Sequence, residues 1–202
     1  MNTEKIRKDF PVLSRVMNKK TPVYLDSACM SLKPKQVLET MNAYYTDYSA
    51  CAGRSNHKLG VEATENYEKA RKEIAKFISA KPEEIIFTKN TTEGINLVSH
   101  AVEFNGKDTV VTSDREHNSN LIPWQMLDKK GVKHRVVKSN PDETFNLDAL
   151  QESVGNSTKL VSVVHVSNID GYEIRGWSAE LCRRDRPCSG LQVFGKNRNE
   201  QY

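Results

Sequence analysis

No run of about 18 or more apolar residues occurs in this 202-residue chain, so we expect no membrane-spanning helix and no membrane partner. The N-terminus, MNTEKIRKDF, is charged and lacks the apolar core of a signal peptide, which predicts a cytoplasmic protein. The four cysteines form no CxxC pair and show no metal-ligand spacing. They are Cys29, Cys51, Cys182 and Cys188. We therefore expect reduced thiols, with neither a disulfide framework nor a metal site.

The chain also lacks a strong charge of either sign. Its formal net charge is +4, and the basic residues are spread along the chain, so no nucleic-acid partner is expected. Hydrophobic residues make up 37% and charged residues 28%, which is typical of a globular domain with a real core.

Strand-like and helical segments alternate from about residue 84 onward. This alternation predicts an α/β fold with a mostly parallel sheet and helices on both faces. Before it, the pattern predicts helices over 3–9, 33–48 and 59–78, a short strand at 23–25 and a loop at 49–56. The later strands are expected at 84–88, 109–112, 132–138 and 159–166, and the later helices at 91–104, 120–130 and 147–154.

Polar residues follow three of the expected strands, at the end of the strand where open α/β sheets bind ligands. The first turn, NTTEGIN, places Thr91 and Thr92 at a helix N-terminus. The unpaired N–H groups and the two hydroxyls there suit a phosphate. An ordinary helix cap, with Glu93 completing the first turn, explains the same residues and is the commoner arrangement.

The second turn, SDREHNSNLIPW, places His117 where the chain leaves the sheet. An imidazole there can stack on a planar cofactor or move a proton, although a solvent-exposed loop histidine is the alternative. In the third turn, HVSNIDG, Asn168 either bonds a ring substituent of a ligand or forms the turn before Asp170 and Gly171. Three such turns at one sheet edge together favour a binding site.

Six segments in order across residues 9–174 carry a family pattern. They are DFPVLSR (9–15), YLDSAC (24–29), KPKQV (33–37), FTKNTTEGINLV (87–98), EHNSNLIPWQML (116–127) and VHVSNIDG (164–171). The sequence resembles the fold-type I enzymes that use pyridoxal 5′-phosphate (PLP). Within them it is similar to the cysteine desulfurases and selenocysteine lyases of the class V aminotransferase family.

The resemblance implies a PLP cofactor and roles for four residues after the second strand-like segment. Thr91 and Thr92 would hold the cofactor phosphate. His117 would stack on the pyridine ring and assist proton transfer as the catalytic residue. Asn168 would bond the 3-hydroxyl oxygen of the ring.

Three earlier residues are implied to lie near the substrate: Ala28, Arg54 and His57. Arg54 and His57 would approach the active site or the dimer partner, because the family is homodimeric. The implied substrate is L-cysteine or a related amino acid, and a sulfur-acceptor protein is an implied partner.

Two cysteines depart from the family pattern. The family often has two small residues after Asp-Ser, whereas Cys29 and Met30 follow Ala28 here. Cys51 stands in a loop that lies near the active site in relatives. A reactive role and an inert thiol both stay open, and the inert thiol is favoured because nothing in the sequence indicates a depressed pKa.

The resemblance ends near Ile174. The family's Asp for the pyridine nitrogen, Schiff-base lysine, catalytic cysteine loop and substrate-binding arginine have no counterpart in the last 28 residues, and Lys196 follows Asn168 too closely. Basic residue usage changes at the same place, from 18 Lys and 6 Arg through residue 174 to 1 Lys and 5 Arg after it. We favour a frameshifted or recombined end over a genuine terminal segment.

We therefore expect an N-terminal helical arm over 1–22, a partial PLP-dependent transferase major domain over 23–174, incomplete at its C-terminus, and an atypical, frameshifted or disordered tail over 175–202. The parent activity is expected to be sulfur transfer from L-cysteine, giving alanine and an enzyme persulfide. The chain itself is expected to be poorly stable and inactive. The alternatives are another class V member, a selenocysteine lyase or an epimerase-like enzyme, and a non-catalytic dimerisation or binding module.

Overall fold

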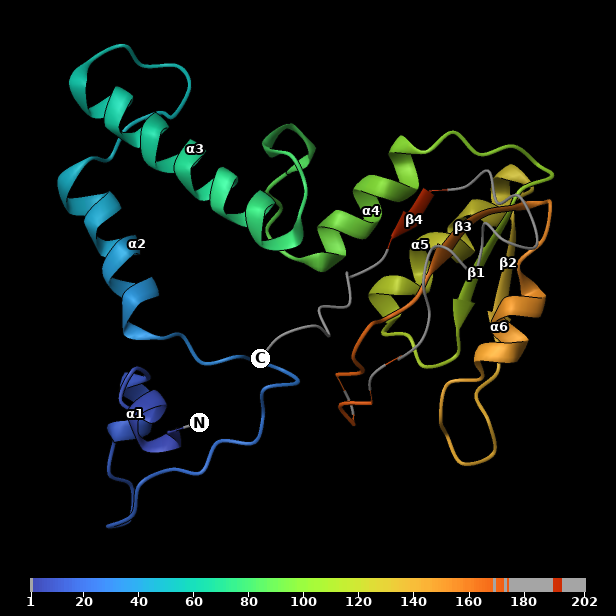
Figure 1. Ribbon diagram of the computed structural model, residues 1–202, viewed down its shortest axis with the longest axis horizontal. Helices are drawn as coiled ribbons and strands as arrows, with labels where there is room; N and C mark the ends of the chain where they lie inside the picture. Colours follow the sequence, from blue (N-terminus) through green and yellow to red (C-terminus); the bar gives the residue numbers. More distant parts are fainter. Residues whose placement is uncertain (1, 169, 173, 175–190, 194–202) are drawn as a thin grey trace. The chain divides into compact units, whose positions relative to one another are not determined.

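A computed structural model describes residues 2–168, 170–172, 174 and 191–193 of the chain (Figure 1). The chain divides into two compact units, Met1–Ile86 and Phe87–Tyr202, which we describe separately. The expected domain limits at residues 22 and 174 stay predictions. No helix in the described part of the chain is long and apolar enough to cross a membrane.

The first unit is helical. Its elements are α1 (Thr3–Arg7), η1 (Pro11–Ser14), α2 (Lys35–Asp47), α3 (Lys58–Ile78) and η2 (Pro82–Glu84), where η denotes a 3-10 helix. The predicted helices over 3–9, 33–48 and 59–78 and the loop at 49–56 are thus confirmed. Asn2 caps α1 by accepting the Lys5 N–H at 3.0 Å. Ser79 ends α3 in the left-handed conformation, with φ at 57°.

Two predicted strands, at 23–25 and 84–88, are wrong, because neither segment is a strand in the structure. Val23 and Leu25 are 80% and 90% exposed, so their apolar side chains find no sheet to pack on. Pro82 begins η2, and the Glu84 carboxylate accepts the Lys81 N–H at 2.7 Å. The Glu84 side chain therefore caps the start of a helical turn. The residues that follow it do not pair with another strand.

The second unit contains a parallel sheet of order β2-β1-β3-β4. Its strands are β1 (Thr109–Ser113), β2 (Lys133–Val137), β3 (Thr158–Ser162) and β4 (Leu191–Val193). Its helices are α4 (Thr91–Ala101), η3 (Asn118–Asn120), α5 (Ile122–Gln125), η4 (Met126–Lys130) and α6 (Leu147–Ser153). The predicted parallel α/β arrangement is confirmed. The structure adds β4, which pairs with β3 although it lies in the segment expected to be an atypical tail.

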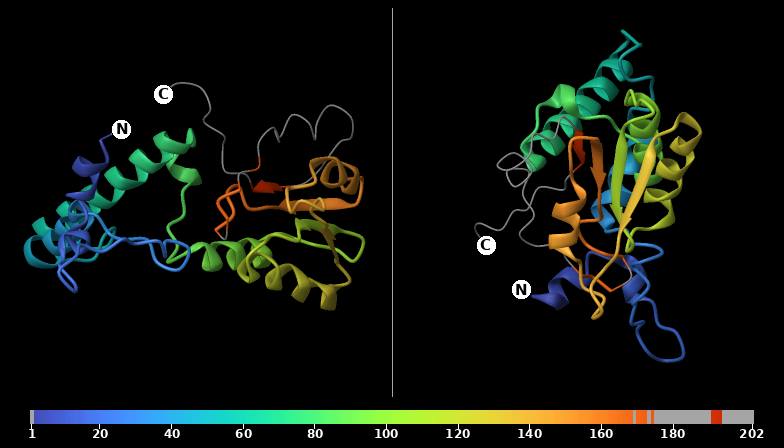
Figure 2. Two further views of the ribbon diagram at one scale, coloured as in Figure 1. Left: turned by 90° about the horizontal axis from the view of Figure 1, so that it is seen from below. Right: turned by 90° about the vertical axis from the view of Figure 1, so that its right-hand side faces the viewer.

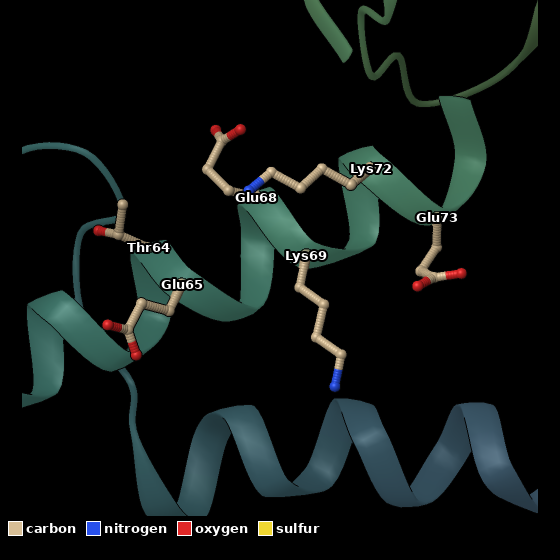
Figure 3. A pocket seen from close by; sticks show the side chains of 6 residues that line it. All are labelled: Thr64, Glu65, Glu68, Lys69, Lys72 and Glu73. Carbon is tan, nitrogen blue, oxygen red and sulfur yellow. The ribbon is translucent and has the colours of Figure 1, made fainter. Parts of the chain in front are cut away.

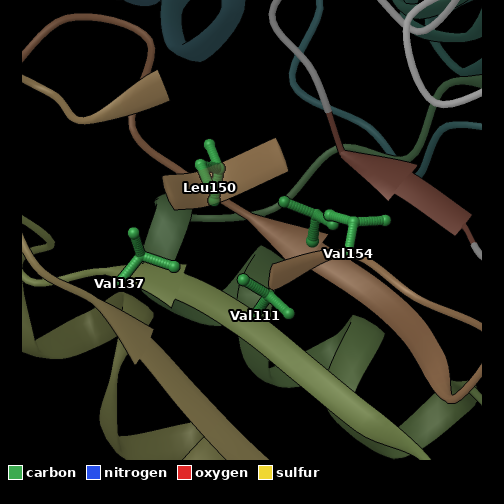
Figure 4. Close-up of a cluster of buried hydrophobic side chains, with 5 residues drawn as sticks. Val111, Val137, Leu150 and Val154 are labelled. Atoms are coloured by element: carbon green, nitrogen blue, oxygen red, sulfur yellow. The ribbon is translucent and has the colours of Figure 1, made fainter. Parts of the chain in front are cut away.

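Successive residues of the strands pack on opposite faces of this sheet, as the pleat requires. On one face a buried cluster joins strand residues to α6 and the residue that ends it (Figure 4). This cluster consists of Val111, Val137, Leu150, Val154 and Val161. The opposite face packs against α5 and η4, with α4 beside them (Figure 2). That cluster consists of Val110, Trp124, Leu127, Val132 and Leu160, with Ile95, Val98 and Phe104 against it. Helices cover both faces, as predicted.

The predicted single helix over 120–130 is instead the succession of η3, α5 and η4. Pro123 has no N–H to donate and fits only the first turn of a helix, so a new helix begins at Ile122. Gly131 ends the succession with φ at 76°, the left-handed conformation that favours glycine.

Candidate functional site

The N-terminus of α4 has an ordinary cap, which leaves the first two residues of the helix without intrahelical acceptors. Asn90 caps it by accepting the Glu93 N–H at 2.9 Å, and the Glu93 carboxylate accepts the Lys89 N–H at 2.6 Å. Thr91 and Thr92 are exposed at the first two helical positions. Their backbone N–H groups have no acceptor within the helix, because the first turn of any helix lacks one. The cap therefore leaves two N–H groups and two hydroxyls for a ligand.

His117 lies four residues after the end of β1 and caps η3. Its Nδ1 accepts the Ser119 N–H at 3.1 Å and lies 2.9 Å from the Ser119 hydroxyl. Because Nδ1 accepts a backbone N–H, the neutral ring carries its proton on Nε2. The exposed imidazole is thus held in one orientation with a donor on its outer nitrogen.

A buried carboxylate stands next to His117 in the chain. Glu116 is only 8% exposed, and it accepts hydrogen bonds from the Ser113 hydroxyl and, at 2.8 Å, from the Asn120 amide. The Val164 N–H, just beyond β3, donates to both carboxylate oxygens, at 3.0 and 2.9 Å. Burial raises the pKa of Glu116 above its ordinary value, and the hydrogen bonds from Ser113, Asn120 and Val164 oppose that shift.

Asn120 extends this network into the core. Its side-chain oxygen accepts the Trp124 indole N–H at 3.0 Å and the Ser162 hydroxyl at 2.6 Å. Trp124 is 1% exposed and belongs to the core cluster that contains Val110 and Leu160. A polar network thus joins the end of β3, the His117 segment and the hydrophobic core, with its polar atoms satisfied by one another.

Asn168 is exposed on a tight turn after β3. The Gly171 N–H donates to the Ser167 carbonyl at 2.9 Å, and the Ser167 N–H donates to the Tyr172 carbonyl at 2.9 Å. Gly171 has φ at 72°, the left-handed conformation that the turn requires. Asp170 accepts the Tyr172 N–H at 3.0 Å and forms an ion pair with Arg115. The hydrogen bond from the Tyr172 N–H foremost, then one from the Ser167 side chain and the charge of Arg115, lower the pKa of Asp170.

The second unit brings the segments of all four predicted cofactor residues close to one another. Helix α4, with Thr91 and Thr92, packs against η3, which His117 caps. Strands β1 and β3 are neighbours, so the turns with His117 and Asn168 leave adjacent strands. Among the described residues no hydrogen bond joins these four side chains directly.

The three predicted substrate-proximal residues belong to the first unit. Ala28 is exposed in the turn that the Met30 N–H closes on the Asp26 carbonyl at 3.1 Å. His57 caps α3, its Nδ1 accepting the Gly60 N–H at 3.3 Å. Arg54 lines an open groove of about 900 Å³ with the exposed Cys51. The groove also contains Tyr44, Tyr48 and Tyr67.

A second hollow on α3, of about 410 Å³, contains none of the predicted site residues (Figure 3). It is lined by Thr64, Glu65, Glu68, Lys69, Lys72 and Glu73. Acidic and basic residues alternate along this one helix at salt-bridge spacing, which is typical of a solvated helix face. Cys29 is exposed, whereas Cys182, Cys188 and Lys196 lie outside the described residues. In the described part of the chain no group of three acidic, His or Cys side chains could hold a metal.

Arg115, Glu116 and Asn120 belong to the network around His117 but were not predicted from the sequence. The position of Glu116, three residues after a buried strand, could have indicated its role. A carboxylate that stays near the sheet at such a position needs hydrogen-bond donors around it. Glu116, Asn120 and Trp124 are also spaced by four residues, which places side chains on one side of a helical stretch. This spacing could have indicated that the three side chains interact.

Comparisons with known proteins show which family the chain resembles. The aminotransferase class-V family model matches residues 23–177. A cysteine desulfurase of Salmonella gallinarum is 41% identical over 175 residues, which cover 84% of this chain and 43% of the relative. The chain thus spans less than half the length of the curated relatives it matches.

Several solved structures, two of them cysteine desulfurases, are also similar to this chain. The apo cysteine desulfurase of Thermococcus onnurineus NA1 has a TM-score of 0.71 and 40% identity, covering 82% of this chain and 40% of that one. The Escherichia coli cysteine desulfurase CsdA has a TM-score of 0.69 and 29% identity, covering 86% and 43%. A C-DES mutant with glycine covalently linked to its PLP cofactor shares the fold, at a TM-score of 0.75 and 20% identity over 95% and 50%. This chain belongs to the aminotransferase class-V family.

Proposed function

We propose that this chain carries the cofactor-holding residues of a PLP-dependent protein of the cysteine desulfurase type. The family is PLP-dependent, and the curated relatives are cysteine desulfurases. One observation carries the proposal. The first turn of α4, the His117 segment and the Asn168 turn all belong to one unit, where α4 packs against η3 and β1 lies beside β3.

The first turn of α4 fits a phosphate group. Thr91 and Thr92 offer two hydroxyls and two backbone N–H groups at the positive end of the helix dipole. The Asn90 cap occupies the Glu93 N–H and leaves the two preceding N–H groups for the ligand. We therefore assign the cofactor phosphate to these two residues.

The two strand-end segments fit a planar, polar ring. His117 is exposed with its Nδ1 held by Ser119, so its ring can stack on the pyridine and its Nε2 can hold a proton. Asn168 is exposed with a side-chain amide that can donate to the 3-hydroxyl oxygen. When bound, PLP supplies the electron-withdrawing ring that activates amino-acid substrates.

For the whole protein, we propose sulfur transfer from L-cysteine to a protein thiol, which yields alanine and a protein persulfide. Ala28, Arg54 and His57 are proposed to lie near that substrate. We further propose a cytoplasmic homodimer that passes its sulfur to an acceptor protein. In the 202-residue polypeptide no lysine segment resembles the Schiff-base lysine of the family, so we expect the polypeptide to bind PLP without desulfurating cysteine.

Calorimetry on the 202-residue polypeptide tests the cofactor assignment. PLP is expected to bind at least about tenfold more tightly than pyridoxal, because a hydrogen bond to a charged group contributes about 1.5–3 kcal/mol. The double variant Thr91→Ala/Thr92→Ala is expected to remove this difference. Thr46→Ala, a change at an exposed helical threonine of the first unit, is the matched control.

Two results would contradict the proposal. Equal affinity of the wild type for PLP and pyridoxal would show that Thr91 and Thr92 do not bind the cofactor phosphate. A lysine adduct found by mass spectrometry after borohydride treatment of the PLP-loaded polypeptide would show a covalent cofactor link, and the expectation of an inactive polypeptide would then be wrong.

A further inference from the structure

Two consecutive residues tie the segment before His117 to the chain that leaves β3. Arg115 forms an ion pair with Asp170, across 55 residues of sequence. Glu116 accepts the Val164 N–H on both carboxylate oxygens. Neither contact is needed to form β1 or β3, because both lie beyond the paired residues of these strands.

Arg115 is held on more than one side. Its side chain is 13% exposed, and its guanidinium lies 6.0 Å from the centre of the Phe145 ring. The Phe145 ring lies 5.7 Å from that of Tyr172, whose N–H donates to Asp170. The ion pair is therefore backed by an aromatic pair, so it is more restrained than a pair between two mobile surface side chains.

The two tethers bracket Asn168. Val164 lies four residues before Asn168 and Asp170 two residues after it, and the turn between them is closed by the Gly171–Ser167 hydrogen bond. Both tethers end on the two residues that immediately precede His117. The stretch that carries Asn168 is therefore fixed, at both ends, to the stretch that carries His117.

We propose that Arg115, Glu116 and Asp170 are positioning residues, which hold Asn168 at a fixed distance from His117 so that the two side chains meet one planar ring. This inference rests on the proposed PLP function and deepens it. A site with its groups already in place loses less conformational freedom on binding and so binds more tightly. The tethers act on the ring and not on the phosphate, because Thr91 and Thr92 lie on α4.

Calorimetry with two probes, PLP and inorganic phosphate, distinguishes positioning from a general loss of structure. We expect Asp170→Asn and Arg115→Met each to weaken PLP binding by about two- to fivefold, the range typical of a single ion pair. Phosphate affinity should stay unchanged. Arg115→Lys keeps the charge and should restore most of the PLP affinity, and the double variant Arg115→Met/Asp170→Asn should be no weaker than either single one.

Asp128→Asn is the matched control, because Asp128 is an exposed carboxylate of the same unit. Hydrogen exchange supplies a readout without cofactor, since Asp170→Asn should speed exchange of the backbone amides from 164 to 171 and Asp128→Asn should not. If the wild type binds phosphate but not PLP, the proposed function fails and the positioning role falls with it. If the wild type binds PLP and Asp170→Asn matches Asp128→Asn in PLP affinity, or weakens phosphate equally, only the positioning role is overturned.

Discussion

The Glu116 carboxylate takes the place of a neighbouring strand for Val164, whose backbone N–H lies 3.0 and 2.9 Å from the two carboxylate oxygens. Strand β3 ends at Ser162, so this N–H falls just past the ladder. A buried N–H without an acceptor is costly, and here a side chain from the segment after β1 provides one. The end of the sheet is thus fixed by a carboxylate.

Replacing this carboxylate should destabilise the second unit. In Glu116→Gln one carboxylate oxygen becomes an NH₂ group, which cannot accept from Val164 or Asn120. We expect the free energy of unfolding to fall by about 1–3 kcal/mol, measured by urea denaturation. Glu152→Gln, on the exposed side of α6, is the control and should change little. Equal losses in the two variants would contradict a special role for Glu116.

The pH dependence of stability should also report on Glu116. Burial raises its pKa in the folded protein above the ordinary 4.5, so the folded state binds the proton more tightly than the unfolded state. Its contribution to stability is therefore fully present below pH 4.5 and is lost as the pH rises through the folded pKa. Urea denaturation at a series of pH values should show this decline in the wild type and a flatter profile in Glu116→Gln. Parallel profiles would rule out the raised pKa.

His134 should give a dependence of opposite sign. Burial lowers the pKa of His134 from 6.5, and its Nε2 lies 2.9 Å from the Thr112 hydroxyl. Because the folded state disfavours the proton, the contribution is present above pH 6.5 and is lost as the pH falls through the folded pKa. His134→Gln should therefore reduce the acid sensitivity of unfolding, and an unchanged acid sensitivity would contradict the lowered pKa of His134.

The start of α3 depends on a glycine. A Cβ added at Gly60 would lie 2.5 Å from the Ser55 carbonyl oxygen, a backbone atom that cannot simply rotate away. Gly60→Ala should lower the free energy of unfolding of the first unit by about 1–3 kcal/mol, with loss of helical circular dichroism at lower urea concentration. Gly155→Ala is the control, since nothing lies within 4 Å of its added Cβ. An unchanged midpoint for Gly60→Ala would mean that the loop shifts without cost.

Trp124 combines packing with a hydrogen bond, and two substitutions separate them. Trp124→Ala should lower the free energy of unfolding by about 3–5 kcal/mol, because the side chain is 1% exposed in a core cluster. Trp124→Phe keeps most of the ring and loses only the indole N–H, so about 1–2 kcal/mol is expected. The Asn120 oxygen then still accepts from Ser162. Similar losses in both variants would assign the effect to the hydrogen bond alone.

The core of the second unit could be predicted from sequence because its strands contain pairs of adjacent apolar residues. Val110, Val111, Leu160 and Val161 are adjacent apolar residues of strands buried on both faces. The segments at 23–25 and 84–88 also contain apolar residues of the types that favour strands. A strand forms, however, only where a neighbouring strand accepts its hydrogen bonds. The partner is a property of the whole fold, and the local sequence does not contain it.

The same distinction holds for the site. Thr91, Thr92, His117 and Asn168 could be named from motifs after strands, and their roles stay predictions. The Arg115–Asp170 pair could not be named, because its partners are 55 residues apart and meet only through the parallel register of β1 and β3. The burial of Glu116 has the same origin, since only the adjacent strand end makes its carboxylate both enclosed and satisfied.

The hydrogen bonds from Trp124 through Asn120 to Glu116 make Trp124 an intrinsic fluorescent probe of the His117 segment. The indole is enclosed in the core, yet only one side chain, that of Asn120, separates it from Glu116, the residue beside His117. The chain has two tryptophans, Trp124 and Trp177, so a Trp177→Phe variant isolates the emission of the first. Any rearrangement of the His117 segment then becomes visible as a change in the colour and intensity of one fluorophore, without a label.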